Sequence, residues 1–245
     1  AQQTVAAQRT AAAQQTAVAQ KTATAGTTPT TTATAGASPT STPVMSADMT
    51  TPPPPPVGAG TNVLTDPAPY CDQAQATWTK DNATSVTCNS AGLPTITAQS
   101  SSQSACIEQP TTIIADGYFE VIAQPQSGGA ILAFREGNGQ SSSTATVTTT
   151  NITGYFFKVD RSAGNYALAR FDASGQATIV KQGNLPDPLA QHFALGVLFK
   201  GSAITLYING VQLDSVSDTT FSSGYIGLCT DGTVTYSHAQ AYRAG

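Results

Sequence analysis

Carboxyl groups are the first place to look for hydrolytic chemistry in this chain, and they are few. The segment from residue 70 onward holds only three glutamates, Glu108, Glu120 and Glu136, and none lies within ten residues of another. Glycoside hydrolysis needs two carboxyl groups, about 5 Å apart for retention and further apart for inversion. A catalytic pair would have to be assembled from separate strands. We therefore expect a protein that is not an enzyme.

Histidine and serine give no alternative catalytic arrangement. The chain contains two histidines, His192 and His238, and it has no G-x-S-x-G sequence that would hold a nucleophilic serine. His192 is expected to begin a strand. His238 alternates with Tyr236 and Gln240, which predicts that the three share one face of a strand.

Four cysteines, Cys71, Cys88, Cys106 and Cys229, form no CxxC pair, so a zinc site would need an unusual set of ligands. Two disulfides are the simpler interpretation and imply an oxidising compartment. Four cysteines allow three pairings. We favour Cys71 with Cys88 and Cys106 with Cys229, although the sequence leaves the choice open.

These residues all belong to one part of the chain, because the first sixty-nine residues contain neither an aromatic residue nor a cysteine. Residues 1–25 are an arm of four six-residue units that begin at Gln2, Gln8, Gln14 and Gln20. Residues 26–69 form a linker rich in Thr, Ser and Pro, with a proline run at 52–56 that predicts a stiff polyproline II spacer. Residues 70–245 are predicted to be a single globular domain.

The arm suits an extended strand, because a six-residue period is divisible by two and keeps the same faces in every repeat. A bundle of Ala-rich helices is the alternative conformation. So few large apolar side chains cannot offset the entropy lost on ordering. An ordered arm must therefore lie against something else, and we expect residues 1–50 to link copies of the same protein, by strand addition to a neighbour's sheet edge or by bundling. A flexible or O-glycosylated stalk is the competing interpretation.

The globular part reads as an all-β sandwich, because short apolar or alternating runs are separated by Gly, Asn, Asp and Ser. The predicted strands are 118–123, 130–135, 144–149, 154–159, 166–171, 177–181, 193–199, 203–208, 211–216, 225–228 and 233–242. Asn209-Gly210 predicts a type I′ hairpin turn. In that hairpin Ile204, Leu206 and Ile208 face the core, and Thr205 and Tyr207 face outward.

The stretch from His192 to Leu228 resembles the concanavalin A-like lectin/glucanase superfamily, which includes laminin G-like modules. The resemblance rests on a hairpin that ends in Tyr-x-Asn-Gly, an Asp-bearing loop, and Gly224-Tyr225-Ile226-Gly227-Leu228 before a last strand. Residues 116–134 and 154–171 look like the early strands of the same jelly roll, and Trp78 lies where such domains often begin. The resemblance covers roughly residues 71 to 245 and implies a concanavalin A-like jelly-roll β-sandwich behind an extended arm.

That resemblance also implies ligands. Carbohydrate binding typically uses exposed aromatic rings with planar polar groups, and the candidates are Tyr155, Asn165, Tyr166, Arg170 and Tyr207. Tyrosines also stabilise cross-strand pairs without binding anything. Some relatives bind Ca²⁺ through loop oxygens, for which Asp214, Asp218 and Asp231 are the candidates. We otherwise expect no cofactor.

Composition restricts the partners. The chain has ten basic and fourteen acidic residues and a net charge of −4, so neither nucleic acid nor an anionic membrane surface is an expected partner. No apolar run is long enough to cross a bilayer. Asn82 and Asn151 lie in N-glycosylation sequons, which fits a secreted or cell-surface protein.

Taken together, the sequence predicts a non-enzymatic extracellular subunit of a filament or sheath that displays a lectin-like sandwich. A stalked carbohydrate-binding or adhesion module is the alternative, and a glycoside hydrolase is the third possibility.

Overall fold

The computed structural model describes residues 45–71, 78–80, 84–99, 104–137 and 153–245. The hexad arm, the predicted strand 144–149 and both glycosylation sites, Asn82 and Asn151, lie outside the described residues. The described residues belong to one compact unit, Val44–Gly245. They contain strands, turns and bends but no helix, and hence no helix that could cross a membrane.

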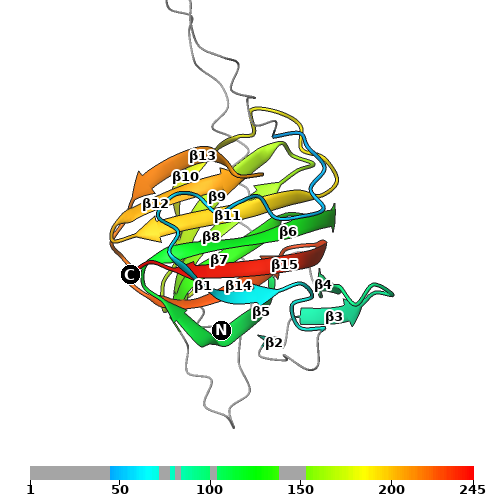
Figure 1. Ribbon diagram of the computed structural model, residues 1–245, viewed down its shortest axis with the longest axis horizontal. Helices are drawn as coiled ribbons and strands as arrows, with labels where there is room; N and C mark the ends of the chain where they lie inside the picture. The colour runs from blue at the N-terminus through cyan, green and yellow to red at the C-terminus, as the bar shows by residue number, and fades with distance from the viewer. Residues whose placement is uncertain (1–44, 72–77, 81–83, 100–103, 138–152) are drawn as a thin grey trace, which may run out of the picture. The chain divides into compact units, whose positions relative to one another are not determined.

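Two antiparallel sheets are stacked face to face, as in a sandwich (Figure 1). Sheet A runs in the order β13 (Val211–Ser217), β12 (Ala203–Ile208), β11 (Phe193–Lys200), β6 (Gly117–Ser127), β15 (Thr233–Arg243), β4 (Pro94–Ala98) and β3 (Thr84–Cys88), and β1 (Thr61–Asp66) also pairs with β15. Sheet B runs in the order β10 (Ala177–Asn184), β9 (Asn165–Phe171), β8 (Thr153–Asp160), β7 (Ala130–Gly137), β14 (Gly224–Thr230), β5 (Ala105–Ile114) and β2 (Thr79–Lys80). The all-β sandwich predicted from the sequence is confirmed.

The core lies between the sheets because their strands alternate apolar and other side chains with a period of two. On β11, Phe193, Leu195, Val197 and Phe199 are fully buried and belong to the central cluster. The predicted hairpin is also confirmed: Asn209 and Gly210 both have positive φ, 52° and 75°. Ile204, Leu206 and Ile208 point into the core while Thr205 and Tyr207 are half-buried on the other face.

The expected boundary at residue 70 is wrong, because the folded unit begins about twenty-five residues earlier. Strand β1 pairs with β15 from Thr61↔Arg243 to Asp66↔Ala239. The Asp66 carboxylate is buried and accepts a hydrogen bond from the Trp78 indole at 2.8 Å. Backbone hydrogen bonds to a sheet edge need no large side chains, which is why composition did not reveal this strand. Strands β2 to β5 were also missed.

Both favoured disulfides are formed, Cys71–Cys88 and Cys106–Cys229. Cys106 and Cys229 are register partners on the neighbouring strands β5 and β14. That disulfide is buried with Ile131, Ala133 and Phe156 in a small apolar cluster separate from the central core. It therefore crosslinks the paired strands β5 and β14 within sheet B.

Candidate functional site

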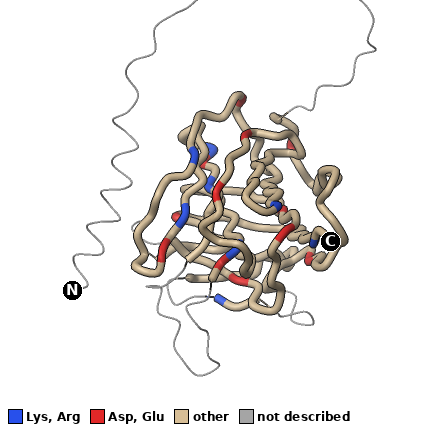
Figure 2. The backbone as a smooth tube through the Cα atoms, turned by 90° about the vertical axis from the view of Figure 1, so that its left-hand side faces the viewer, with Lys and Arg blue, Asp and Glu red and all other residues tan. Residues whose placement is uncertain are grey.

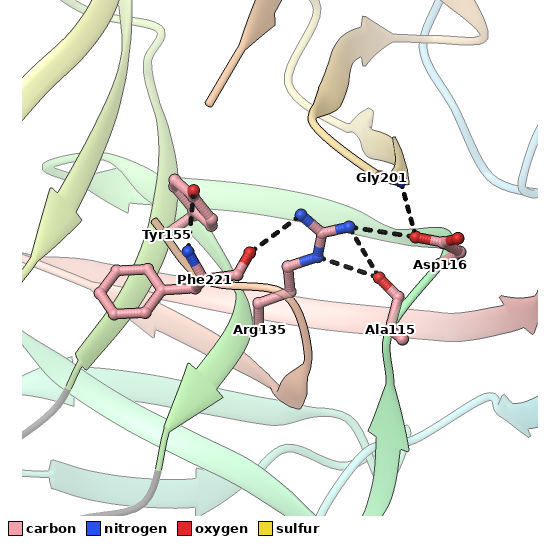
Figure 3. A network of polar contacts seen from close by, with 6 residues as sticks. All are labelled: Ala115, Asp116, Arg135, Tyr155, Gly201 and Phe221. Atoms are coloured by element: carbon pink, nitrogen blue, oxygen red, sulfur yellow. Dashed lines mark hydrogen bonds and ion pairs between the residues drawn. The ribbon is translucent and has the colours of Figure 1, made fainter. Parts of the chain in front are cut away.

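Arg135 is the centre of a buried polar network at one end of the sandwich (Figure 3). Its guanidinium donates to the carbonyl oxygens of Ala115, at 2.8 and 3.0 Å, and of Phe221, at 3.0 Å. It also pairs with the Asp116 carboxylate at 3.2 Å and lies over the Phe199 ring. Arg135 has a positive φ of 49° at an irregularity of β7, and its side chain is only 1% exposed. These contacts tie the ends of both sheets together.

Asp218 is the centre of a second set of polar contacts, next to the Arg135 network. It accepts hydrogen bonds from the Tyr155 hydroxyl at 2.6 Å and the Thr220 amide at 2.8 Å, and it pairs with Arg170. Burial alone would raise the pKa of Asp218, but these hydrogen bonds outweigh it and lower the pKa to about 2. The Tyr155 hydroxyl also accepts from the Phe221 amide, which connects Asp218 to the Arg135 network (Figure 3).

Asp214 on β13 likewise contacts a tyrosine hydroxyl and a cation, here from strands β9 and β10 of sheet B. It accepts a hydrogen bond from the Tyr166 hydroxyl at 2.6 Å and pairs with Lys181 of β10 at 3.2 Å. Burial and the bond to Asp214 raise the pKa of Tyr166 to about 12. Three predicted sugar-binding residues, Tyr155, Tyr166 and Arg170, thus contact two predicted calcium ligands, Asp218 and Asp214.

This arrangement changes the interpretation of both groups. Tyr155 and Tyr166 are buried, at 0% and 7% exposure, so the expectation that they offer an exposed aromatic platform is wrong. Their hydroxyls instead donate hydrogen bonds to the carboxylates of Asp218 and Asp214. Asn165 lies where β9 begins, half-buried and opposite Asp160 of β8.

The three predicted calcium ligands do not converge. Asp231 lies in the turn between β14 and β15, where it accepts from the Gly129 amide at 2.8 Å and pairs with Lys158. Among the described residues, no three His, Cys, Asp or Glu side chains gather closely enough to hold a metal ion. Charged residues, coloured blue and red on the backbone in Figure 2, are sparse along the described chain. Asp214, Asp218 and Asp231 each pair with a cation of the protein itself.

A second polar region lies on the outer face of sheet A, which points away from sheet B. We call it the tyrosine face, and it consists of Tyr118, Glu120, Tyr207, Gln240 and Tyr242. The Tyr118 ring packs edge-on against Tyr207, with centroids 5.9 Å apart, and lies 6.1 Å from the ring of Tyr242. Tyr118 also covers Gly196, where any side chain would collide with its hydroxyl. Tyr207 is the one predicted sugar-binding residue found here.

Glu120 is the buried centre of the tyrosine face. Its register partners are Gly196 on β11 and Gln240 on β15. Its Oε2 accepts a hydrogen bond from the Tyr118 hydroxyl at 2.9 Å, whereas Oε1 is buried and has no hydrogen-bond partner among the described residues. Burial raises the pKa of Glu120 to about 7, although the bond from Tyr118 acts in the opposite direction. Tyr118 and Glu120 alternate with the core residues Phe119 and Val121, and this alternation is the sequence signal that indicates the face.

Residues 45–60, which we call the strap, lie beside the outer face of sheet A, to which Glu120 points. Figure 1 shows the strap crossing in front of sheet A before it enters β1. Its contacts with sheet A include Pro53 against Gly210 and Gly60 against the backbone of Arg243. Glu120 and Tyr118 point away from the core and are both 0% exposed, on the face that the strap crosses between its contacts at Gly210 and Arg243.

Comparison with known proteins identifies the fold. No protein-family model matches the chain, and no curated protein matches it. Carbohydrate binding module CBM66 from Bacillus subtilis is similar in structure, with a TM-score of 0.54 and 17% identity over 66% of this chain and 93% of that one. A Bacillus subtilis protein with a galectin-like fold gives 0.58 and 14% over 75% and 96%.

The β-glucanase of Bacillus licheniformis gives a TM-score of 0.50 and 12% identity over 75% of this chain and 99% of that one. Identities this low establish the fold alone. The described unit is a concanavalin A-like jelly-roll β-sandwich, of the architecture seen in these lectin-like and glucanase structures.

Proposed function

We propose that the unit from residue 44 to 245 is an exported, non-catalytic carbohydrate-binding module and that the tyrosine face is its binding site. The observation that carries this proposal is the buried Oε1 of Glu120, for which the described part of the chain supplies no hydrogen-bond partner. A buried polar atom without a partner costs free energy, and proteins keep such atoms where another role requires them. A sugar hydroxyl is a group of the right size and polarity to complete this site.

The neighbouring side chains suit a sugar ring. Tyr207 is half-buried and offers ring surface, and the Gln240 amide and the Tyr242 hydroxyl add hydrogen-bonding groups, already joined to each other at 2.6 Å. Sites for small neutral ligands typically combine aromatic walls with a few fixed polar groups. The face carries no cation among its five residues, which favours a neutral glycan over an anionic one.

The absence of catalysis at the tyrosine face is part of the proposal, because Glu120 is the one carboxyl group among its five residues. Glu120 is on the outer face of β6 in sheet A, whereas Glu108 and Glu136 are on β5 and β7 of sheet B, on either side of Gly227 of β14. Asp116, four residues before Glu120, is paired with Arg135 and accepts from the Gly201 amide. The two disulfides and the fold likeness to carbohydrate-binding structures support a secreted or cell-surface location.

A glycan array with β-linked glucan, galactan, mannan and chitin oligosaccharides tests the site. We expect wild-type protein to be retained on one glycan class, and Tyr207→Ala and Glu120→Gln to lower its affinity at least about tenfold, as loss of a central contact does. Tyr225→Ala is the matched control, because Tyr225 is a half-buried tyrosine on sheet B. Retention of wild type and Tyr207→Ala to the same extent would remove the tyrosine face from consideration.

Self-assembly is the second proposed function, through residues 1–43, the part of the expected 1–50 arm that precedes the compact unit, with the sandwich displayed on a filament or sheath. The supporting observation is that β13 and β10 end their sheets in the described part of the chain. Such edges are where an extended segment of another copy can add as a strand. Both functions are compatible in one protein.

A further inference from the structure

The proposed binding face is closed in this structure: Glu120 and Tyr118 are fully buried, and the strap runs in front of sheet A from its contact at Gly210, next to β12, to its contact at Arg243 of β15. A glycan can reach Glu120 only if the strap moves. The way in which the strap is attached shows which part of it can do so.

The first residues of the strap are tightly held. The Asn209 amide donates to the carbonyl oxygens of Met45 and Ala47, at 2.6 and 3.2 Å. The Asp48 carboxylate accepts from the His192 backbone amide at 2.9 Å, and Met49 donates to the His192 carbonyl at 3.1 Å. The Met45 side chain is buried in the central core. This end is an anchor.

The last residues of the strap are held as well. Ala59 is 3% exposed, and the backbone of Gly60 passes so close to Arg243 that no other residue would fit. The chain then continues directly into β1, which is paired with β15 along its length. The second anchor is therefore part of sheet A.

The span between the anchors, residues 50–58, is held by little. Thr50, Thr51, Pro54, Pro55, Val57 and Gly58 are exposed, and Val57 is fully exposed at 101%. Pro53 packs on Gly210, and Ala59 donates to Pro56 in a turn at the end of the span. Five consecutive prolines keep the span extended without internal hydrogen bonds, so lifting it breaks few interactions.

We infer that the strap is a lid over the tyrosine face, which opens by lifting residues 50–58 while both anchors stay in place. This inference rests on the proposed function and adds its regulation: glycan binding and strap closure compete for the same surface. Opening lets water or a sugar hydroxyl reach Glu120 Oε1, so the closed state is the one with an unsatisfied carboxyl group. The stiffness of the proline run makes the lid move as a unit.

A disulfide lock provides the first test. In the double variant Pro53→Cys/Gly210→Cys the new thiols lie at a point where the span touches sheet A. Pro53→Cys and Gly210→Cys alone are the baselines, and the second carries the same strain at the turn φ of 75° as the locked protein. Relative to both, we expect the locked protein to lose glycan retention on the array by at least about tenfold, as loss of a central contact would. Equal retention by the locked protein and the single variants would overturn the lid.

A second test does not need a ligand. All four native cysteines are in disulfides, so spin labels can be attached at Val57→Cys and Lys200→Cys, two exposed positions on the strap and on β11. We expect pulsed electron–electron distance measurements to show a main short distance and a second, longer one. Asn209→Gly keeps the positive φ of the turn but removes an anchor, and it should increase the longer population severalfold.

These results separate the two proposals. A single narrow distance in both the labelled wild type and the Asn209→Gly variant refutes the lid, whatever the array shows. A strap that opens in a protein retained by no glycan supports the lid and refutes the carbohydrate function.

Discussion

At the scale of single residues, hydroxyl groups of buried tyrosines hold the carboxyl groups of this protein in place. Tyr155 donates to Asp218, Tyr166 to Asp214 and Tyr118 to Glu120, in each case within 2.9 Å. The two aspartates also have cations beside them and stay ionised, because these contacts lower their pKa values. No cation among the described residues pairs with Glu120, and its pKa rises instead. A carboxyl group that accepts a tyrosine hydroxyl therefore has a lowered pKa where a cation lies beside it, as in Asp214 and Asp218, and a raised pKa where it is buried without one, as in Glu120.

Glu120 should make the stability of the protein depend on pH. Its pKa rises from 4.5 to about 7 on folding, so between these values the native state keeps a proton that the unfolded chain has lost. The free energy of unfolding should therefore fall as pH rises from about 4.5 to about 7, by up to about 3 kcal/mol. Denaturant unfolding at several pH values measures this. Glu120→Gln should flatten the profile over that range, and an unchanged slope in the variant would contradict the assignment.

Asp218 should be coupled energetically to Tyr155. Asp218→Ala leaves the buried Tyr155 hydroxyl without its acceptor, which costs about 1–3 kcal/mol of unfolding free energy. In a Tyr155→Phe background the same substitution should cost less, because no hydroxyl is left stranded. A double-mutant cycle measured by denaturant unfolding gives the coupling. Equal costs of Asp218→Ala in the two backgrounds would mean that the hydrogen bond does not contribute.

At the scale of elements, the described unit depends on strands that carry little sequence signal. β1 is mostly exposed, yet it pairs with β15 and fixes the end of the strap on sheet A. The Cys71–Cys88 disulfide follows it closely and ties this region to β3, whereas Cys106–Cys229 crosslinks β5 and β14. The two disulfides thus protect different parts of the sandwich.

Removal of the two disulfides should have unequal effects. The Cys106–Cys229 bond spans 123 residues and Cys71–Cys88 spans 17, so loop entropy predicts stabilisation by about 5 and about 3 kcal/mol. We expect Cys106→Ala/Cys229→Ala to lower the melting temperature more than Cys71→Ala/Cys88→Ala. Calorimetry of both double variants measures the difference, and the reverse order would show that strand attachment matters more than loop length.

At the scale of the whole molecule, the compact unit begins at Val44, so assembly can be separated from folding. A variant that lacks residues 1–43 should remain folded and monomeric, with unchanged glycan retention, while the full chain forms polymers. Light scattering and negative-stain electron microscopy of both proteins measure this. Polymers formed equally well by the truncated protein would exclude the arm as the assembly element.

Much of the fold could be predicted from residue order, because alternation with a period of two and the Asn209-Gly210 turn are local properties. They gave the strands from β6 onward that the structure describes, and the turn's geometry, whereas β1 to β5 were missed. The favoured cysteine pairing was also confirmed, but only the register of β5 with β14 explains it. The candidate site was predicted less well, since Tyr207 alone of the proposed sugar-binding residues lies on the tyrosine face.

By itself, the sequence determined that this chain folds as a β-sandwich with few charges and with two disulfides available. Only the tertiary structure decided what the polar residues do. It placed Tyr155 and Tyr166 on aspartates and the strap in front of sheet A, because contacts between distant residues, such as Met45 with Asn209 at 164 positions apart, depend on how the sheets stack. Local pattern carries no information about such long-range partners.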